Sequence, residues 1–400
     1  MERAVVVGAG PAGLAVAAML RRRGTDPLVV DRSDRVGASW HGHYDRLHLH
    51  TARWLSNLPG LRMPRSYGRY VAREHVVEYL ERYAEHHRLR LSLSTEVRRI
   101  DRVGTAWRLD TSTGPIDTAY VVVATGHNHT PVLPDWPGRY AFTGELVHAS
   151  GYRNPEPFAG RDVLVVGAGN TGAEIAVDLV EGGARRVRLA VRTPPNILRR
   201  EVAGLPSQAV SVLVRHLPTR VVDRMIATAA RLSVPDLSAK GLPRPADGAY
   251  TRIVRDDRVP ILDVGLIEAV QAGRVEVVGA VEGFSRDEVL LAGGDRITTD
   301  AVVVAAGYLR GLEPLVGHLG VLRPDGRPRV HGAATDALAP GLWFTGYTNP
   351  ISGMLRELGI DARRIARALA SASAAEVNRP AGRGARRRLP ATVGRPGRRP

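Results

Sequence analysis

The sequence predicts an α/β protein in which two Rossmann-like domains share one chain, the second inserted in the first. The chain carries two nearly identical glycine-rich turns, AVVVGAGPAG at residues 4–13 and VLVVGAGNTG at residues 163–172. Each turn follows a run of β-branched residues and opens an apolar-periodic helix. Buried-strand patterns recur late in the chain, after the second unit. We therefore expect two Rossmann-like dinucleotide-binding domains, with the last part of the first domain following the second domain in the sequence.

The first unit consists of a short strand, the turn and a helix. Gly8 permits the tight turn, Gly10 lets the backbone approach a pyrophosphate, and Gly13 lets the helix pack closely on the strand. A second strand then ends in Asp31, whose carboxylate can accept hydrogen bonds from a ribose hydroxyl. The residues predicted to contact this first dinucleotide are Gly8, Gly10, Pro11, Ala12, Gly13, Asp31 and Arg32.

The second unit repeats this pattern at residues 161–183, with its glycines in the same register. Its second strand ends at Arg192 instead of an acid. A guanidinium there can hold a 2′-phosphate through two hydrogen bonds, so this site should prefer NADPH to NADH. The alternative is that Arg192 is only the solvated end of a strand. The predicted contacts of the second dinucleotide are Gly167, Gly169, Asn170, Thr171, Gly172 and Arg192.

The order of the strands predicts where the domains begin and end. A buried strand within residues 119–131 belongs to the first domain, and we expect the late strand within residues 299–311 to be its parallel partner. A glycine-containing segment and a final helix then complete that domain. The predicted division is residues 1–150 for the first part of the first domain, 151–300 for the second domain, 301–375 for the rest of the first domain, and 376–400 for a disordered basic tail.

Composition limits the function classes. The formal net charge is +16, and residues 376–400, with eight Arg and one Glu, carry +7 of it. This stretch has too few apolar residues to fold, so we expect a solvated tail without a specific nucleic-acid partner, or at most a loose anionic contact. The chain has no cysteine, which excludes disulfides and thiolate chemistry and favours a cytoplasmic location. No apolar run reaches the ~20 residues of a membrane span, and glycines interrupt the apolar N-terminal stretch in strand, turn, helix order, unlike a signal peptide.

The segment between the two turns carries the most specific motif, because Phe142, Gly144, His148 and Tyr152 reproduce the pattern F-x-G-x-x-x-H-x-x-x-Y. With this motif, the sequence resembles the flavin-containing monooxygenases, and among them the YUCCA-type plant enzymes and their bacterial relatives. The segments DRVGASW, YDRLHLH, EYLERYA and VPILDVG are also close to that family. The related Baeyer-Villiger monooxygenases usually carry Trp-Pro where this chain has Tyr152 and Arg153.

The resemblance implies FAD in the first domain and NADPH in the second. NADPH would reduce FAD, the reduced flavin would capture O2 as a hydroperoxyflavin, and one oxygen atom would pass to a small-molecule substrate. The implied reaction is N- or S-oxygenation, or a YUCCA-like oxidative decarboxylation of a 2-oxo acid. His148 and Tyr152 would position the nicotinamide against the flavin, or else form a hinge without cofactor contact. Further FAD contacts implied by the resemblance are Trp40, His48, Val97, Thr125, Gly126 and Gly346.

Two side chains are candidates for a catalytic role near the flavin. Many family members place an Asn after a Tyr and Leu run; His50 stands at that position here, as in YUCCA-type members, and Asn57 follows it. Four histidines lie within residues 41–50, but only Asp45 is interleaved with them, so we expect no metal site.

Other functions stay open from the sequence. One alternative is a Baeyer-Villiger monooxygenase acting on a ketone, and another is a non-catalytic nucleotide-binding regulator. The two-dinucleotide disulfide reductases share the fold but need a cysteine pair that this chain lacks. Residues 201–259 predict short helices that either roof the substrate entrance or complete the core, and a homo-oligomer is also open.

Overall fold

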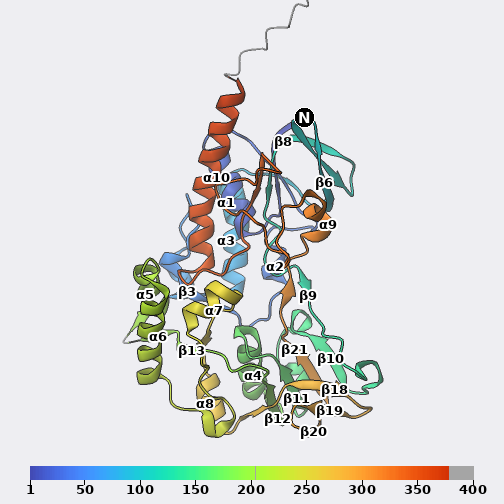
Figure 1. The fold of residues 1–400 in the computed structure, drawn as a ribbon, viewed down its shortest axis with the longest axis vertical. Coiled ribbons are helices and arrows are strands. Elements are labelled where there is room, and N and C mark those ends of the chain that lie inside the picture. Colours follow the sequence, from blue (N-terminus) through green and yellow to red (C-terminus); the bar gives the residue numbers. More distant parts are fainter. Residues whose placement is uncertain (203, 378–400) are drawn as a thin grey trace, which may run out of the picture.

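The computed structural model describes residues 1–202 and 204–377. Two main sheets lie at opposite ends of an elongated molecule, one in the upper and one in the lower half of Figure 1. The long helix α10 (Met354–Val377) packs beside α1 (Pro11–Arg21) on the first sheet. Buried apolar clusters cover both faces of each sheet, which gives the chain two cores.

The first sheet has the strand order β5-β2-β1-β8-β7-β6, with β23 also paired to β8. Strands β5, β2, β1, β8 and β23 run parallel, whereas β6 and β7 form an antiparallel extension. The central strands are runs of fully buried valines, as expected for a parallel sheet covered on both faces. The bounds are β1 (Glu2–Val7), β2 (Leu28–Val30), β5 (Arg90–Ser92), β6 (Val97–Val103), β7 (Ala106–Thr111), β8 (Ile116–Val123) and β23 (Leu342–Phe344).

The second sheet is entirely parallel, with the order β10-β21-β11-β12-β17. Its strands are β10 (Glu145–His148), β11 (Asp162–Val166), β12 (Arg186–Ala190), β17 (Val275–Val278) and β21 (Ala301–Val304), and it is covered by α4 (Asn170–Glu181) and α8 (Leu266–Gln271).

This topology corrects two sequence predictions. The late strand β21 does not pair with β8 but lies between β10 and β11 in the second sheet, and β23 takes the place beside β8. Strands β10 and β21 both fall outside the predicted range 151–300, although they belong to that sheet. The reason is that both sheets need a short, fully buried apolar strand, and the residue pattern does not distinguish between them.

Smaller elements connect the two sheets. The paired strands are β3 (His48–Ala52) with β4 (Tyr70–Ala72), β9 (Thr130–Pro131) with β22 (Tyr308–Leu309), β13 (Ile197–Arg199) with β16 (Ile261–Asp263), β14 (Glu201–Val202) with β15 (Leu205–Pro206), and β18 (Val281–Phe284), β19 (Glu288–Leu291) and β20 (Arg296–Thr298). The remaining α-helices are α2 (Ala38–His41), α3 (Arg73–His86), α5 (Ser207–Val214), α6 (Thr219–Ser233), α7 (Ala249–Asp256) and α9 (Glu313–Val316). The helices predicted within residues 201–259 are confirmed, and α6 packs against α7 and β13.

The C-terminal helix extends further than predicted. Helix α10 ends at Val377, so it includes the first two residues of the predicted tail. The rest of that tail lies outside the described residues. Among the described residues, no helix combines the length and the apolar character needed to cross a membrane.

Candidate active site

The two glycine-rich turns adopt the same geometry. Gly8 and Gly167 both have φ of 113°, a conformation that favours glycine. A Cβ at Gly13 would overlap the carbonyl oxygen of Gly8, and the corresponding glycine of the second unit stands in the same relation to Gly167. A Cβ at Gly10 or Gly169 would meet no atom within 4 Å. Each turn therefore packs its helix tightly on the strand and leaves open space at the helix N-terminus, where an anion is stabilised.

The first turn borders a pocket of about 290 Å³ that also contains Asp31, Arg32, Val97 and Thr125. Asp31 accepts hydrogen bonds from the backbone N–H of Ala9 at 2.7 Å and of Ser33 at 2.8 Å. These bonds fix the carboxylate at the end of β2. His129 also lines this pocket, as expected for a loop beside the flavin, and the pocket residues that the sequence did not predict are Val7, Val30, Thr95, Glu96, Arg98, Gly311, Pro314 and Leu315.

Two further predicted contacts of the first site, Thr125 and Gly346, lie near the same turn. The predicted residues Gly10, Pro11, Ala12, Gly13 and Gly126 do not line the pocket. The hydroxyl of Tyr347 is 3.0 Å from the backbone N and 2.8 Å from Oγ1 of Thr125. A Cβ at Gly346 would lie 3.3 Å from Cβ of Ala12, so this segment packs against the start of α1. Thr125 and Gly346 thus converge on the first turn from β8 and β23, two neighbouring strands.

The second turn borders a pocket of about 590 Å³ that contains Gly167, Gly169, Asn170 and Arg192. The Arg192 side chain is exposed and has no hydrogen-bond or ion-pair partner among the described residues. Asn170 has a structural task, since its side chain donates to the carbonyl of Pro260 at 3.1 Å and accepts from Leu262 N–H at 2.8 Å. Arg252 and Arg258 line the same pocket beside Asp257, so with Arg192 the basic residues of the lining outnumber the acidic ones. Of the predicted contacts, Thr171 and Gly172 lie outside the lining.

The motif between the turns is built into the second unit. His148, at the end of β10, contacts the carbonyl of Gly307 at 3.2 Å, and its burial lowers its pKa. Since Gly307 lines the second pocket, this contact holds the pocket wall. The Tyr152 hydroxyl donates to Asp178 on α4 at 2.8 Å, and the Tyr152 ring meets Tyr44 of the first unit edge-on at 6.3 Å. Both polar bonds therefore stay within the second unit, and only the ring contact of Tyr152 crosses to the first.

Helix α4 also holds the catalytic candidate His50. Its Nε2 lies 2.7 Å from Oε1 of Glu174, and the Tyr44 hydroxyl donates to the other carboxylate oxygen at 3.1 Å. One turn further, Asp178 faces Arg46 at 3.7 Å. Burial raises the pKa of both Tyr44 and Asp178. We call Glu174, Asp178 and Glu181 the acidic face of α4; it joins the second unit to the segment 44–50 of the first.

The other predicted residues do not join this group. Asn57 accepts from Met63 N–H at 2.7 Å and donates to the carbonyl of Trp54, so its side chain is committed to its own loop. His48 is exposed, and its Nδ1 lies 2.7 Å from the carbonyl of Arg46. Trp40 packs edge-on against His43. The structure therefore supports His50 over Asn57 as the polar group at the junction.

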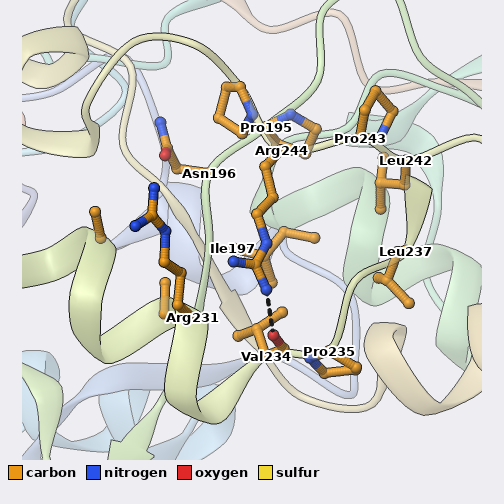
Figure 2. A pocket seen from close by; sticks show the side chains of 13 residues that line it. Pro195, Asn196, Ile197, Arg231, Val234, Pro235, Leu237, Leu242, Pro243 and Arg244 are labelled. Atoms are coloured by element: carbon orange, nitrogen blue, oxygen red, sulfur yellow. Dashed lines mark hydrogen bonds between the residues drawn. The ribbon is translucent and has the colours of Figure 1, made fainter.

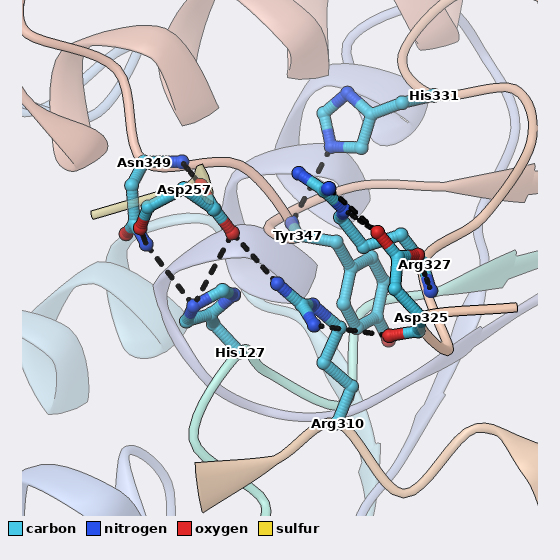
Figure 3. A network of polar contacts seen from close by, with 8 residues as sticks. All are labelled: His127, Asp257, Arg310, Asp325, Arg327, His331, Tyr347 and Asn349. Atoms are coloured by element: carbon cyan, nitrogen blue, oxygen red, sulfur yellow. Dashed lines mark hydrogen bonds and ion pairs between the residues drawn. The ribbon is translucent and has the colours of Figure 1, made fainter. Parts of the chain in front are cut away.

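A polar cluster lies where the two units meet, and the sequence did not predict that its members come together. Figure 3 shows Asp257, His127, Arg310 and Asn349 pointing toward one another. Arg310 Nη2 donates to Oδ2 of Asp257 at 2.6 Å. Burial and the nearby arginine lower the pKa of His127. The one local feature that marks this cluster is the positive φ of Asp257, 60°, and this backbone angle cannot be read from the sequence.

A third cavity is smaller, about 130 Å³, and lies between α6, β13 and the loop 234–245. Figure 2 shows Arg244 spanning it to the carbonyl of Val234, at 2.9 Å. It shares Pro195 and Asn196 with the second pocket. Within the described part of the chain, no group of three or more His, Asp and Glu side chains could hold a metal ion.

The two larger pockets fit the two expected dinucleotides. Each has an open helix N-terminus beside a glycine turn, which suits a pyrophosphate. The first offers a carboxylate at the end of its second strand, which suits the ribose of FAD. The second offers, at the same place, the Arg192 guanidinium, which has no partner within the described part of the chain and suits NADPH.

Comparison with known proteins agrees with this geometry. The family model described as "Pyridine nucleotide-disulphide oxidoreductase" matches residues 5–216. The chain is 39% identical over 310 residues to the indole-3-pyruvate monooxygenase YUCCA1 of Oryza sativa subsp. japonica, covering 76% of each chain. It is similar to the flavin-containing monooxygenase from Stenotrophomonas maltophilia, with a TM-score of 0.71, 25% identity, and coverage of 93% of this chain and 100% of that one.

A more distant structure shares the fold alone: OTEMO in complex with FAD and NADP matches with a TM-score of 0.72 at 17% identity, over 94% of this chain and 85% of that one. The YUCCA1 and Stenotrophomonas maltophilia matches agree with the two nucleotide pockets, one in each unit. The chain belongs to the flavin-containing monooxygenase family and is an FAD- and NADPH-dependent monooxygenase.

Proposed function

We propose that this monooxygenase acts on a small 2-oxo acid and cleaves it oxidatively to the carboxylic acid one carbon shorter. The observation that carries the proposal is the 39% identity to an indole-3-pyruvate monooxygenase over three quarters of both chains. In the balanced reaction, R–CO–COOH, O2, NADPH and a proton give R–COOH, CO2, water and NADP⁺. The bond between the two carbonyl carbons breaks, and NADPH supplies the two electrons that reduce the second oxygen atom to water.

When bound, FAD supplies the redox chemistry that accepts a hydride and passes on oxygen. The protein's part is to hold both dinucleotides and keep water out. The open space beside Gly10 and Gly169 admits the two pyrophosphates, and Asp31 accepts from a ribose hydroxyl. Arg192 is proposed to hold the 2′-phosphate of NADPH through charge-assisted hydrogen bonds.

His50 is the proposed polar group at the reaction centre. Its Nε2 lies 2.7 Å from Oε1 of Glu174, and its Nδ1 is a buried nitrogen to which the described residues offer no hydrogen-bond partner. A buried imidazole nitrogen of this kind is costly unless a ligand engages it. Tyr44, which bonds the same carboxylate, is 3% exposed and closes the junction against solvent.

The test is product analysis with four probes: indole-3-pyruvate labelled with ¹³C at C1, a tertiary amine, a thioether and a cyclic ketone. The FAD-loaded enzyme with NADPH and ¹⁸O2 should release labelled CO2 and place one ¹⁸O atom in the acid product. Sulfoxide or N-oxide formation without CO2 release would replace the proposal with N- or S-oxygenation. A lactone from the ketone would indicate a Baeyer-Villiger enzyme, and NADPH consumption without any oxygenated product would argue against all three.

We also propose a cytoplasmic location without a specific nucleic-acid partner, which rests on the cysteine-free sequence and on residues 376–400, a stretch with few apolar residues that carries +7 of the net +16. Cell fractionation and gel-shift measurements with duplex DNA test the two statements. Analytical ultracentrifugation decides whether the protein forms a homo-oligomer.

A further inference from the structure

Asp257 ends helix α7 in an unusual backbone conformation. Its φ of 60° lies in the left-handed region, which costs a non-glycine residue free energy unless its surroundings hold it there. Its side chain is 12% exposed and points out of the second unit toward the first (Figure 3). The contacts of this side chain therefore outweigh the strain.

Those contacts come from three segments: the turns that follow β8 and β23 of the first sheet, and the turn after β22, whose Gly311 lines the first pocket. Arg310, which follows β22, donates to Oδ2 of Asp257 at 2.6 Å and is itself only 15% exposed. Asn349, which precedes α10, donates its backbone N–H to Oδ1 at 3.2 Å and its side-chain amide to the Asp257 carbonyl at 3.2 Å. His127, which follows β8, lies 3.7 Å from Oδ2 and 3.1 Å from the Asn349 amide. Asp257 is thus the meeting point of three segments.

The same residue forms part of the second nucleotide pocket. Residues 257–260 line that pocket together with the glycine turn of α4. At the far end of this stretch, Asn170 at the start of α4 binds Pro260 and Leu262. The stretch is therefore tied to the second unit by Asn170 and to the first unit by Asp257. It therefore ties the wall of the second pocket to the first unit, in addition to the contacts of the acidic face of α4.

We propose that Asp257 is a positioning residue for the hydride transfer between the two dinucleotides. Its ion pair with Arg310 holds the wall of the NADPH pocket at one fixed place relative to the FAD unit. Both charges are largely withdrawn from water, so losing one partner leaves the other buried and uncompensated. The wall then moves, the dinucleotide is held less tightly, and water reaches the junction. This role does not depend on which substrate is oxidised.

The test uses Asp257→Gly and Asp257→Asn in the FAD-loaded full-length protein. Glycine adopts a φ of 60° without strain, so Asp257→Gly removes the carboxylate without endangering the backbone. Asp257→Asn keeps the size and hydrogen-bonding capacity while removing the charge. The matched control is Asp247→Asn, which breaks the Asp247–Arg255 pair of 2.7 Å, an exposed pair in the same part of the second unit.

Titration calorimetry with NADP⁺ should show a dissociation constant raised roughly tenfold in both Asp257 variants, the size expected for one buried charge-assisted hydrogen bond. The fraction of NADPH that ends as H2O2 should rise, and hydrogen exchange should increase over residues 249–263. FAD content should stay at the wild-type level. A merely structural role would alter unfolding but leave the H2O2 fraction unchanged.

The double variant Asp257→Gly/Arg310→Met provides a second measurement. It is compared with Asp257→Gly and Arg310→Met measured singly. If the pair acts as a unit, the double variant binds NADP⁺ no more weakly than the weaker-binding of these two, because the uncompensated charge is gone. The proposal is overturned if Asp257→Gly and Asp257→Asn bind NADP⁺ and couple oxygen as the Asp247→Asn control does. Additive effects of the two single changes would also overturn it, since they would show that the residues act independently.

Discussion

Two glycines at equivalent places in the two turns allow a reciprocal test of which dinucleotide each unit binds. A Cβ at Gly10 or Gly169 would meet no protein atom within 4 Å. Both residues have extended backbones, with φ of −82° and −96°, which alanine adopts freely. The variants Gly10→Ala and Gly169→Ala should therefore fold normally, and any defect should come from the ligand alone.

The expected size follows from overpacking. The added methyl group stands where the backbone must approach a pyrophosphate, and an extra carbon in a packed contact costs about 1–3 kcal/mol. This corresponds to a dissociation constant raised roughly 5- to 150-fold. Gly10→Ala should lose FAD and keep the NADP⁺ site, whereas Gly169→Ala should keep FAD and weaken NADP⁺. Gly10→Val, with three added carbons, should abolish bound flavin.

The assay combines flavin absorbance per mole of purified protein, back-titration with FAD, and calorimetry with NADP⁺. Circular dichroism checks the fold. Gly13→Ala serves as the opposite control, because its Cβ would overlap the carbonyl oxygen of Gly8 and should destabilise the protein with or without ligand. The reasoning is refuted if Gly10→Ala binds FAD with wild-type affinity, or if either variant loses both dinucleotides to the same extent.

Three further predictions concern single side chains. Arg192→Ala should weaken NADPH binding roughly ten- to a hundredfold and leave NADH binding nearly unchanged, because charge-assisted hydrogen bonds contribute about 1.5–3 kcal/mol. Flavin reduction with both nucleotides measures this, with Arg220→Ala on α6 as the control. An equal loss of affinity for both nucleotides would contradict the prediction. Glu174→Ala should lower the free energy of unfolding by about 2–4 kcal/mol, because it removes the carboxylate that His50 and Tyr44 contact. Glu174→Gln should lower it clearly less. Equal denaturation midpoints for the two variants would argue against the contacts. Burial raises the pKa of Asp361, on α10, to about 6, so the ionised carboxylate costs the folded state stability above that pH. Asp361→Asn should therefore raise the free energy of unfolding above pH 6 by up to about 3 kcal/mol, and this gain should vanish toward pH 4. Thermal unfolding of both proteins across this pH range measures the difference.

The sequence was sufficient to predict the parts of the site that are built from local geometry. A glycine turn between a strand and a helix depends on residues close together in the chain, so Gly8 to Gly13 and Gly167 to Gly172 could be placed in advance. Asp31 and Arg192 follow for the same reason, because each comes within two residues after the strand next to its turn.

Features that depend on distant partners could not be predicted in this way. The valine run of β21 fits either sheet, and only the complete topology assigns it to the second. Asn57 has the chemistry of a catalytic residue, but the loop backbone takes up both of its polar groups. Asp257 and Arg310 lie 53 residues apart in sequence, and no periodicity connects them.

Helix α4 has a consequence for recombining this protein with its relatives. The helix presents its N-terminus to one nucleotide pocket and its acidic face to Tyr44, Arg46 and His50 of the other unit. A chimera that imports the second unit alone would place a foreign helix face against those three side chains. Exchanges should therefore transfer residues 44–50 together with α4. Crossover points chosen only at the boundaries between the two sheets would separate these contacting segments.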